Sequence, residues 1–334
     1  MKIKIYTNKM DILAIKESWD LLFAKRKYSV FQSFVYCYNS LFKASSPFVI
    51  CLFSDEKIKE LWPLELINNQ LRFINDTHAD FCDILSETDS SLIKEHLIAN
   101  NQIGKLKLKN LTQDARVIKK LKGIAHLNVH ASVNFLVLSL SKTDSFPSNF
   151  THFVYRQKRR LMRILKKFSS EHLLFNNKSK VFPKKEILDL RNIMIEKGNR
   201  KHSFLDNHFL LLAEQLYNSG LLIVSVIKIK DNISGISLIF NNENRYSFWV
   251  DLFDDQKMIN LYHNTLFIKN ITENSDATFN FGRGAYDYKV QNYQPEVFGL
   301  FELNIFENML EKVLFQMSQR TKKSIKQFYR KFKR

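Results

Sequence analysis

The chain has 334 residues, enough for about two domains, and 45% of them are hydrophobic, which excludes wholesale disorder. Its three cysteines are odd in number and lack metal-ligand spacing, so we expect reduced, buried thiols at Cys37, Cys51 and Cys82 and no metal site. No stretch reaches the roughly 20 apolar residues that span a bilayer, and the first residues lack the pattern of a signal peptide. We therefore expect a cytoplasmic protein.

The net charge of +18 is concentrated in two segments. Residues 151–170 contain seven Lys or Arg and no acid, and residues 311–334 contain nine Lys or Arg and one acid. Polyanions are the natural partners of such segments: a nucleotide cofactor, an acidic lipid surface or RNA. Two solvated helices, each with one apolar face, would give the same pattern.

The first half of the chain alternates between helical and strand periodicity. Pro63 lies within one predicted strand and favours an edge position or a bulge for it, because proline cannot donate to a strand ladder. We predict strands at Lys2–Tyr6, Phe48–Phe53, Ile58–Leu66, Leu71–Ile74, Phe81–Leu85, Lys105–Leu108 and Val133–Leu140, and helices at Asp11–Ala24, Ser33–Phe42, Ser91–Asn100 and Ala115–Leu121.

The polar segment Ser141–Asn149 is typical of a domain boundary, and the same order of elements recurs after it. Polar turns at 230–232 and 241–244 separate three apolar runs and predict antiparallel hairpins. Gly220 follows a helix at the place of a left-handed cap. We predict helices at Phe153–Phe168, Lys184–Lys197, Asn207–Asn218, Met258–Glu273 and from Glu307 onward, and strands at Leu221–Ile229, Ser234–Phe240, Arg245–Leu252, Ala277–Phe281 and Val297–Ile305.

These elements predict an α/β (α+β) protein with an N-terminal domain at 1–145, a C-terminal domain at 146–310 and a basic C-terminal helix at 311–334. In that helix, Ser318–Arg334 interleaves aromatic residues with cations. The pattern suits peripheral contact with the anionic inner face of a membrane, and it equally suits RNA. A solvated tail that packs only its Phe residues is the alternative.

One short stretch, FNFGRGAYDYK (Phe279–Lys289), concentrates two of the chain's eight glycines around Arg283. The glycines permit backbone angles closed to other residues, and the arginine is a rigid bidentate donor for phosphate or carboxylate. Tyr288 is a candidate proton donor to a leaving thiolate. A tight turn whose arginine pairs with Asp251 or Asp287 is the structural alternative.

The Phe-Gly-Arg-Gly turn at 281–284, followed by Asp287 and by Tyr288-Lys289, resembles a motif of the Fem-like, double-GNAT acetyltransferases of the CelD/BcsL type. Asn280 departs from the acid usual there, and the spacer Ala-Tyr-Asp is altered. In the first half the resemblance rests on Val30–Phe42 and on Trp62–Leu66. It implies two tandem GNAT-like domains, each a mixed, largely antiparallel sheet flanked by helices, with the active site in the second.

The resemblance implies acyl-CoA, most simply acetyl-CoA, as co-substrate and an amine or hydroxyl of a cell-envelope sugar or sugar nucleotide as acceptor. It places the thioester beside Trp249 and Val250 and the phosphates near the next helix, where Lys257, His263, Asn264 and Thr265 are possible donors. That region contains no glycine, and its acids would repel phosphate, so a capped amphipathic helix is the competing interpretation.

The resemblance and the residue types together assign roles to the remaining candidates. Asp251 would be the base, Tyr288 the acid, Lys289 a charge partner, and Arg283 would orient an anionic group. His202 and Asp287 would contact the acceptor. Two other functions stay open: Fem-like transfer from aminoacyl-tRNA to a peptidoglycan precursor, and a non-catalytic, degenerate GNAT scaffold.

Overall fold

The computed structural model describes residues 1–25, 29–41, 46–148, 155–254, 258–284, 286–306, 308–318 and 321, and at Asp287 the backbone only. The chain forms two compact units. Unit 1 comprises Met1–Cys37, Leu41–Ser132 and Leu300–Arg334, and unit 2 comprises Tyr38–Ser40 and Val133–Gly299. The break between units falls inside strands β7 (Leu127–Leu140) and β13 (Glu296–Ile305), and so differs from the predicted division near 145 and 310.

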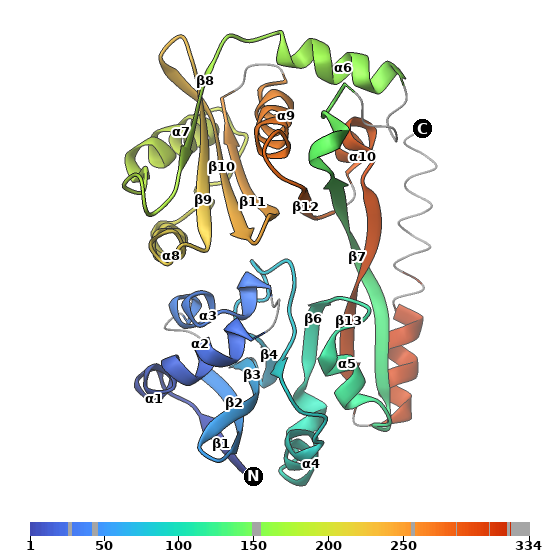
Figure 1. Ribbon diagram of the computed structural model, residues 1–334. Helices are drawn as coiled ribbons and strands as arrows, with labels where there is room; N and C mark the ends of the chain where they lie inside the picture. Colours follow the sequence, from blue (N-terminus) through green and yellow to red (C-terminus); the bar gives the residue numbers. More distant parts are fainter. Residues whose placement is uncertain are drawn as a thin grey trace. The chain divides into compact units, whose positions relative to one another are not determined.

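Unit 1 is built on an antiparallel sheet in the order β1-β2-β3-β4, with β5 also paired to β3. Helix α2 packs on β3 and α4 on β2 (Figure 1). Strand β6 pairs with the end of β13. Its elements are β1 (Lys2–Tyr6), α1 (Lys9–Ala14), α2 (Lys16–Ala24), α3 (Phe34–Ser40, its last three residues in unit 2), β2 (Ser46–Ser54), β3 (Lys57–Ile67), β4 (Gln70–Phe73), β5 (Leu85–Ser86), α4 (Leu92–Ala99), β6 (Lys107–Leu111), α5 (Arg116–Leu121) and the 3-10 turns Val30–Gln32 and Ile103–Lys105.

The prediction that Pro63 marks an edge strand is wrong. Strand β3 lies between β2 and β4, and its register shift falls near Lys59 rather than at the proline. Residues 64–67 pair with β4 and residues 60–61 with β5, so Pro63 occupies the gap between two partners. The ladder needs no N–H on that side, and the Pro63 carbonyl accepts from Ile74 N.

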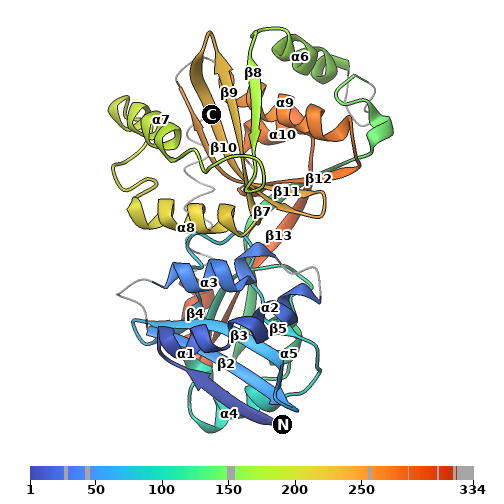
Figure 2. The same ribbon diagram turned by 60° about the vertical axis from the view of Figure 1, so that its left-hand side comes forward.

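Unit 2 is a mixed sheet in the order β7-β12-β11-β10-β9-β8. Helices α7 and α8 lie on one face and α9 on the other (Figures 1 and 2). Both predicted hairpins are confirmed, as is the left-handed Gly220. Its elements are the 3-10 turn Lys142–Asp144, α6 (Tyr155–Leu165), β8 (Glu171–Phe175), α7 (Lys184–Glu196), α8 (Asn207–Asn218), β9 (Leu222–Ile229), β10 (Asn232–Asn242), β11 (Arg245–Phe253), α9 (Ile259–Thr272), β12 (Ala277–Arg283) and α10 (Asp287–Tyr293).

The core of unit 2 is aromatic. The ring of Phe267 on α9 meets Tyr246, Phe248 and Phe279 edge-on, at centroid distances of 5.6, 5.7 and 6.3 Å. Such pairs add about 0.5–1.5 kcal/mol each beyond the area they bury. Strands β11 and β12 are therefore held against α9, and this arrangement frames the site described below.

The basic C-terminal segment is described only as far as a helix over residues 309–318, together with residue 321. The predicted membrane or RNA contact of Ser318–Arg334 thus lies almost entirely outside the described residues. Among the described residues, no helix has both the length and the apolar character needed to cross a bilayer. Cys37, Cys51 and Cys82 are buried free thiols.

Candidate active site in unit 2

A β-bulge turns Asp251 toward α9. Leu238 on β10 pairs with Val250 on β11 and the next residue, Ile239, pairs with Phe248, so Trp249 is the extra residue of the bulge. Side chains alternate between faces along a strand, and the bulge interrupts that alternation. Phe248 and Asp251 consequently both face α9, whereas Trp249 stacks on Phe209 of α8 on the opposite face.

Asp251 is held by neutral hydrogen-bond donors. The Ser237 hydroxyl donates to Oδ1 at 2.8 Å, and the Asn264 amide nitrogen lies 3.5 Å from Oδ2. Burial raises the pKa of the carboxyl, and these contacts together with the positive charges of Lys289 and Arg200 only partly offset it. A carboxylate with a raised pKa is suited to accept a proton from a nucleophile.

The Asn264 side chain leaves one hydrogen-bonding atom unused. Its nitrogen contacts Asp251 and also donates to Asn260 Oδ1 at 2.9 Å, while its buried Oδ1 has no partner. A buried polar atom without a partner costs about 1–3 kcal/mol. The side chain that approaches the carboxylate thus also carries a free acceptor, which the N–H or O–H of a ligand would satisfy.

A buried chain of polar side chains leads away from Asp251 beneath α9. His263 Nδ1 lies 3.5 Å from Ser237 Oγ, and His263 Nε2 lies 2.8 Å from Ser225 Oγ. His172 Nε2 lies 2.8 Å from the same Ser225 hydroxyl. The sequence did not indicate this chain, because its members are scattered over four elements and follow no motif.

The glycine turn ends β12 and allows α10 to start. Gly282 and Gly284 adopt φ of 71° and 94°, as their predicted permissive role requires. Gly284 N donates to Asn134 O at 2.7 Å, and the Asn280 side chain accepts from Gly282 N at 2.8 Å. Asn280 therefore braces the turn. Arg283, half-buried, pairs with Phe135 of β7 at the end of β12.

Helix α10, absent from the sequence prediction, carries Tyr288 and Lys289. Lys289 Nζ donates to Phe281 O, and its positive charge lowers the pKa of Asp251. Although Tyr288 is 52% exposed, its partial burial, followed by the negative charge of Asp251, raises its pKa to about 12. Tyr288 is therefore a weaker acid than an ordinary tyrosine and is better suited to donate a hydrogen bond than a proton.

The residues predicted to hold a cofactor are not all placed for that task. Thr265 is fully buried, and its hydroxyl donates to Leu261 O at 2.6 Å and meets Tyr293, so it packs α9 rather than facing a phosphate. Val250 and Trp249 lie at the bulge. Lys257 falls outside the described residues, as does the side chain of Asp287.

The loop after α7 carries both Arg200 and His202. The His202 side chain is exposed, and its carbonyl accepts from Arg191 at 2.8 Å. The charge of Arg200 acts on both Asp251 and Tyr288, and its guanidinium sits 4.9 Å from the Phe204 ring centroid. The segment GNRKHSF thus places Arg200, which belongs to no motif, within electrostatic reach of Asp251.

Hydrogen-bonded pairing between β11 and β12 covers only three residues on each strand. Arg245–Ser247 of β11 lie parallel to Thr278–Asn280 of β12, and no register continues beyond them. The parallel strands thus part before Asp251 is reached, with Phe248 and Phe281 stacked at 5.5 Å where they separate. Among the described residues, no group of His, Cys, Asp or Glu is arranged to hold a metal ion.

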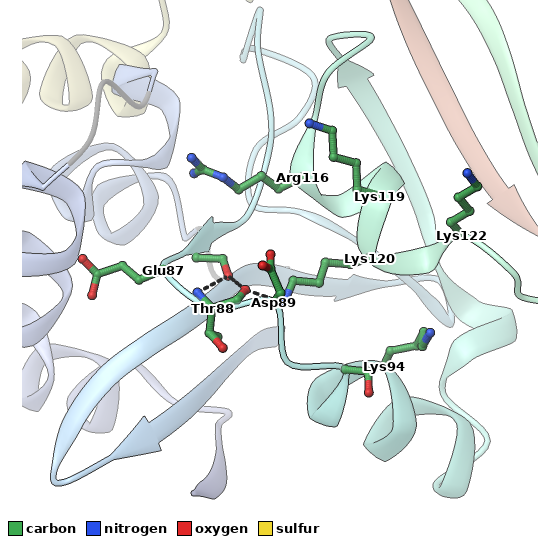
Figure 3. A pocket seen from close by; sticks show the side chains of 10 residues that line it. Glu87, Thr88, Asp89, Lys94, Arg116, Lys119, Lys120 and Lys122 are labelled. Atoms are coloured by element: carbon green, nitrogen blue, oxygen red, sulfur yellow. Dashed lines mark hydrogen bonds between the residues drawn. The ribbon is translucent and has the colours of Figure 1, made fainter.

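Unit 1 carries a separate pocket of about 580 Å³ (Figure 3). The loop after β5 forms one side, Lys94 comes from α4, and α5 and the residue after it supply the remaining cations. All of its lining residues are polar: Ser86, Glu87, Thr88, Asp89, Ser91, Lys94, Arg116, Lys119, Lys120 and Lys122.

The architecture is similar to that of several solved structures. No protein-family model and no curated protein matches the chain. Among solved structures, the C-terminal domain of a putative lysylphosphatidylglycerol synthetase from Agrobacterium fabrum is similar with a TM-score of 0.63 at 10% identity, over 93% of this chain and 95% of that one. FemX is similar with a TM-score of 0.61 at 10% identity, over 95% and 99%.

A tandem GNAT protein from the clavulanic acid biosynthesis pathway matches with a TM-score of 0.50 at 8% identity, covering 91% of this chain and 98% of that chain. The chain has a tandem GNAT fold. The predicted fold class, two GNAT-like domains with largely antiparallel sheets flanked by helices, is thereby confirmed. At such low identity the similarity establishes the GNAT fold alone.

Proposed function

We propose that the protein is an acyltransferase that moves an acyl group to an amine or hydroxyl by direct attack. The pairing of Asp251 with Asn264 supports this proposal most strongly. A carboxylate with a raised pKa lies beside a buried amide oxygen that lacks a donor. A nucleophile that carries two hydrogens, such as a primary amine, could transfer one proton to the carboxylate and donate a hydrogen bond to the amide oxygen through the other.

In this mechanism Asp251 removes a proton from the acceptor as its nitrogen or oxygen attacks the acyl carbon. Asn264 Oδ1 accepts a hydrogen bond from the second N–H of an amine acceptor and so orients the lone pair. Tyr288 and Arg200 stand close enough to Asp251 to act on it electrostatically, and they are candidates to stabilise the developing oxyanion. Collapse of the tetrahedral intermediate re-forms the carbonyl and expels the donor's leaving group, a thiolate in acyl-CoA, which takes up a proton from solvent; no covalent enzyme intermediate is required.

We propose acyl-CoA, with acetyl-CoA first, as the donor. The resemblance to the CelD/BcsL type supports this choice, as does the early end of β11–β12 pairing, because a parted strand can receive the amides of a pantetheine arm. Trp249 and Val250 lie where the pairing ends and would flank the thioester, and Lys257 would contact a phosphate. The fully buried Thr265 would not contact the donor, and Asn264 would contact the acceptor.

On the acceptor side, we propose an amino or hydroxyl group of a cell-envelope sugar or sugar nucleotide, with Arg283, Asp287 and His202 in contact with its anionic or polar parts. A cytoplasmic location, peripheral to the membrane through residues 318–334, fits such an acceptor. A non-catalytic scaffold is the alternative if no donor binds.

Transfer from aminoacyl-tRNA is the second candidate, and helix α6 favours it. The helix buries Gln157, Leu161 and Ile164 and packs on α9 and α10, next to the site. Its outward face leaves Arg156, Arg159, Arg160 and Arg163 exposed. Four exposed guanidinium groups suit an RNA backbone at least as well as the phosphates of CoA.

A donor-binding experiment separates these functions. Thermal unfolding would be followed with acetyl-CoA, longer acyl-CoAs and charged tRNA, on the wild type, on Arg159→Gln/Arg163→Gln and on the control Lys185→Gln, an exposed α7 residue. Stabilisation by a CoA ester alone supports the first proposal. Stabilisation by charged tRNA alone, weakened by salt and by the α6 double variant, supports the second. No shift with any donor would contradict both.

A further inference from the structure

The buried polar chain beneath α9 has a consistent hydrogen-bond direction. Asn270 Nδ2 donates to His172 Nδ1 at 2.7 Å, so the proton of that neutral ring is on Nε2 and points at Ser225. Ser225 then donates to His263 Nε2, which leaves the His263 proton on Nδ1, facing Ser237. Each group therefore donates toward Asp251.

These hydrogen-bonded side chains lie inside the otherwise apolar core of unit 2. Ser225 is 0%, Ser237 1% and His263 3% exposed, whereas His172 is half-buried on β8, the edge strand of the sheet. Burial lowers the pKa of His263 to about 3 and lowers that of His172, so both rings are neutral near pH 7. Gly235 makes room, because a Cβ there would lie 3.0 Å from His263 Nδ1.

We propose that this chain is a proton wire through which Asp251 exchanges its proton with solvent at His172. Protonation of Asp251 shifts each proton one link: from Ser237 to the carboxylate, and from His263 Nδ1 to Ser237. Likewise Ser225 gives its proton to His263 Nε2, and His172 Nε2 gives one to Ser225. A solvent proton then replaces the last one at His172 Nδ1.

In this shift one proton is taken from solvent, one carboxyl is formed, and no imidazolium appears. Both histidines exchange one tautomer for the other, and the Asn270 amide turns its carbonyl toward His172. The other titratable and charged groups that interact with Asp251 are Lys289, Tyr288 and Tyr293 on α10, and Arg200. Lys289 and Arg200 lower the pKa of Asp251 through their positive charge.

The use of the wire in catalysis rests on the proposed transfer function, but the coupling itself can be measured without donor or acceptor. Histidine tautomers would be followed by long-range proton–nitrogen NMR, and Asp251 by its carboxyl carbon shift, as pH is lowered. We expect His263 to move from the Nδ1–H to the Nε2–H form and His172 from the Nε2–H to the Nδ1–H form. Both changes should have the same pH midpoint as the titration of Asp251.

Asp251→Asn should abolish the transition at both rings, and His263→Phe should abolish it at His172. The matched control Asp254→Asn should leave it unchanged. Asp251 titration without a tautomer change at His263 would overturn the wire, as would a His172 that goes directly to imidazolium while His263 stays fixed. Failure of acyl transfer with an intact tautomer switch would contradict the proposed function and leave the wire standing.

The pocket in unit 1 carries a second, independent inference. It lies in the size range of small-molecule sites, about 300–1,000 Å³, yet no apolar side chain lines it. Acyl chains and nucleobases need apolar or aromatic contacts, so a strongly polar ligand is indicated. Figure 3 shows the Lys120 side chain reaching toward Thr88, to whose carbonyl it donates. Lys120 also pairs with the buried Glu60 at 2.8 Å.

After that pairing, a surplus of positive charge lines the pocket. Lys94, Lys119 and Lys122 have no ion-pair or hydrogen-bond partner among the described residues, and Glu87 is already paired with Lys25 at 2.9 Å. Asp89, Thr88 and Ser91 add hydroxyl-binding groups to the same walls. Cations together with carboxylate and hydroxyl groups match a phosphate and a polyol.

We infer that this pocket binds a phosphorylated sugar. Glucose 1-phosphate, inorganic phosphate and glucose would be titrated calorimetrically into the full chain, with Lys119→Gln/Lys122→Gln as test variant and Lys185→Gln as control. The sugar phosphate should bind more tightly than phosphate or glucose. The double substitution should weaken sugar-phosphate binding at least tenfold and leave the unfolding temperature of the protein unchanged. Equal binding by the double variant and the wild type, or no binding at all, would overturn the assignment.

Discussion

Replacement of Asp251 by Asn should stabilise the protein at neutral pH. Burial raises the pKa of this carboxyl, so the folded state holds its proton more tightly than the unfolded state. The stability contributed by the group is therefore greatest below the unfolded pKa of about 3.9 and declines as pH rises through the folded pKa. Above both values, ionised Asp251 destabilises the fold by about 1.4 kcal/mol for each unit of pKa elevation.

Asparagine removes the charge and keeps the contact with Ser237, whose hydroxyl can still donate to its oxygen. Its amide can donate to the unpaired Asn264 Oδ1 once the Asn264 side chain turns to present that oxygen, and the Asn264 bond to Asn260 is then given up. Each kcal/mol gained should raise the unfolding temperature by about 2–4 °C for units of this size. Scanning calorimetry between pH 4 and pH 8 should show a gain in Asp251→Asn that is full at pH 8 and shrinks toward pH 4.

Asp276→Asn is the matched control, because the pKa of Asp276 is lowered where that of Asp251 is raised. Hydrogen bonds from Lys142 N and the Ser141 hydroxyl lower the pKa of Asp276, so its stabilisation is present above the unfolded pKa and is lost as pH falls through the folded value. This variant should be less stable than the wild type at pH 7. If Asp251→Asn is also less stable, or if its gain does not depend on pH, the reasoning about Asp251 is refuted.

Three further predictions concern packing and charge. Gly235→Ala should lower stability by about 1–3 kcal/mol in urea unfolding, because its Cβ would meet His263 Nδ1 at 3.0 Å and Ile227 Cγ1 at 3.1 Å. Glu60→Ala should lower the free energy of unfolding by about 3–5 kcal/mol, since it removes the carboxylate that pairs with the buried ammonium of Lys120; a loss under 1 kcal/mol would contradict this. Spectrophotometric titration should find Tyr288 still protonated at pH 10, in line with its pKa of about 12, and Tyr288→Phe identifies its signal.

Most elements could be predicted because their apolar periodicity is strong and their turns are polar. Asn207–Asn218 was predicted to the residue, and the hairpins around 230–232 and 241–244 have the predicted partners. Strand β8 was missed because Glu171–Phe175 is a short edge strand with little alternation. The helix predicted over Asp11–Ala24 breaks at Ile15, where neither helix has a side-chain cap to mark the join.

The site was only partly accessible to sequence reasoning. The glycine turn and Asp251 stood out as a motif and as the acid that ends a strand. The bulge at Trp249, which decides the face that Asp251 occupies, depends on register with β10 and leaves no local signal. The link from Asp251 to His172 depends on strand order and helix packing, which isolated histidines and serines do not reveal.

The most direct test of the central claim measures CoA release from acetyl-CoA with a panel of amino sugars and sugar nucleotides, in the wild type and in Asp251→Asn. Donor affinity is determined on the same samples. The proposed mechanism predicts acceptor-dependent release that falls about 10²–10⁴-fold in the variant while the donor Kd stays within twofold. Release at the wild-type rate in Asp251→Asn, or a wild type that does not bind acetyl-CoA, would contradict it.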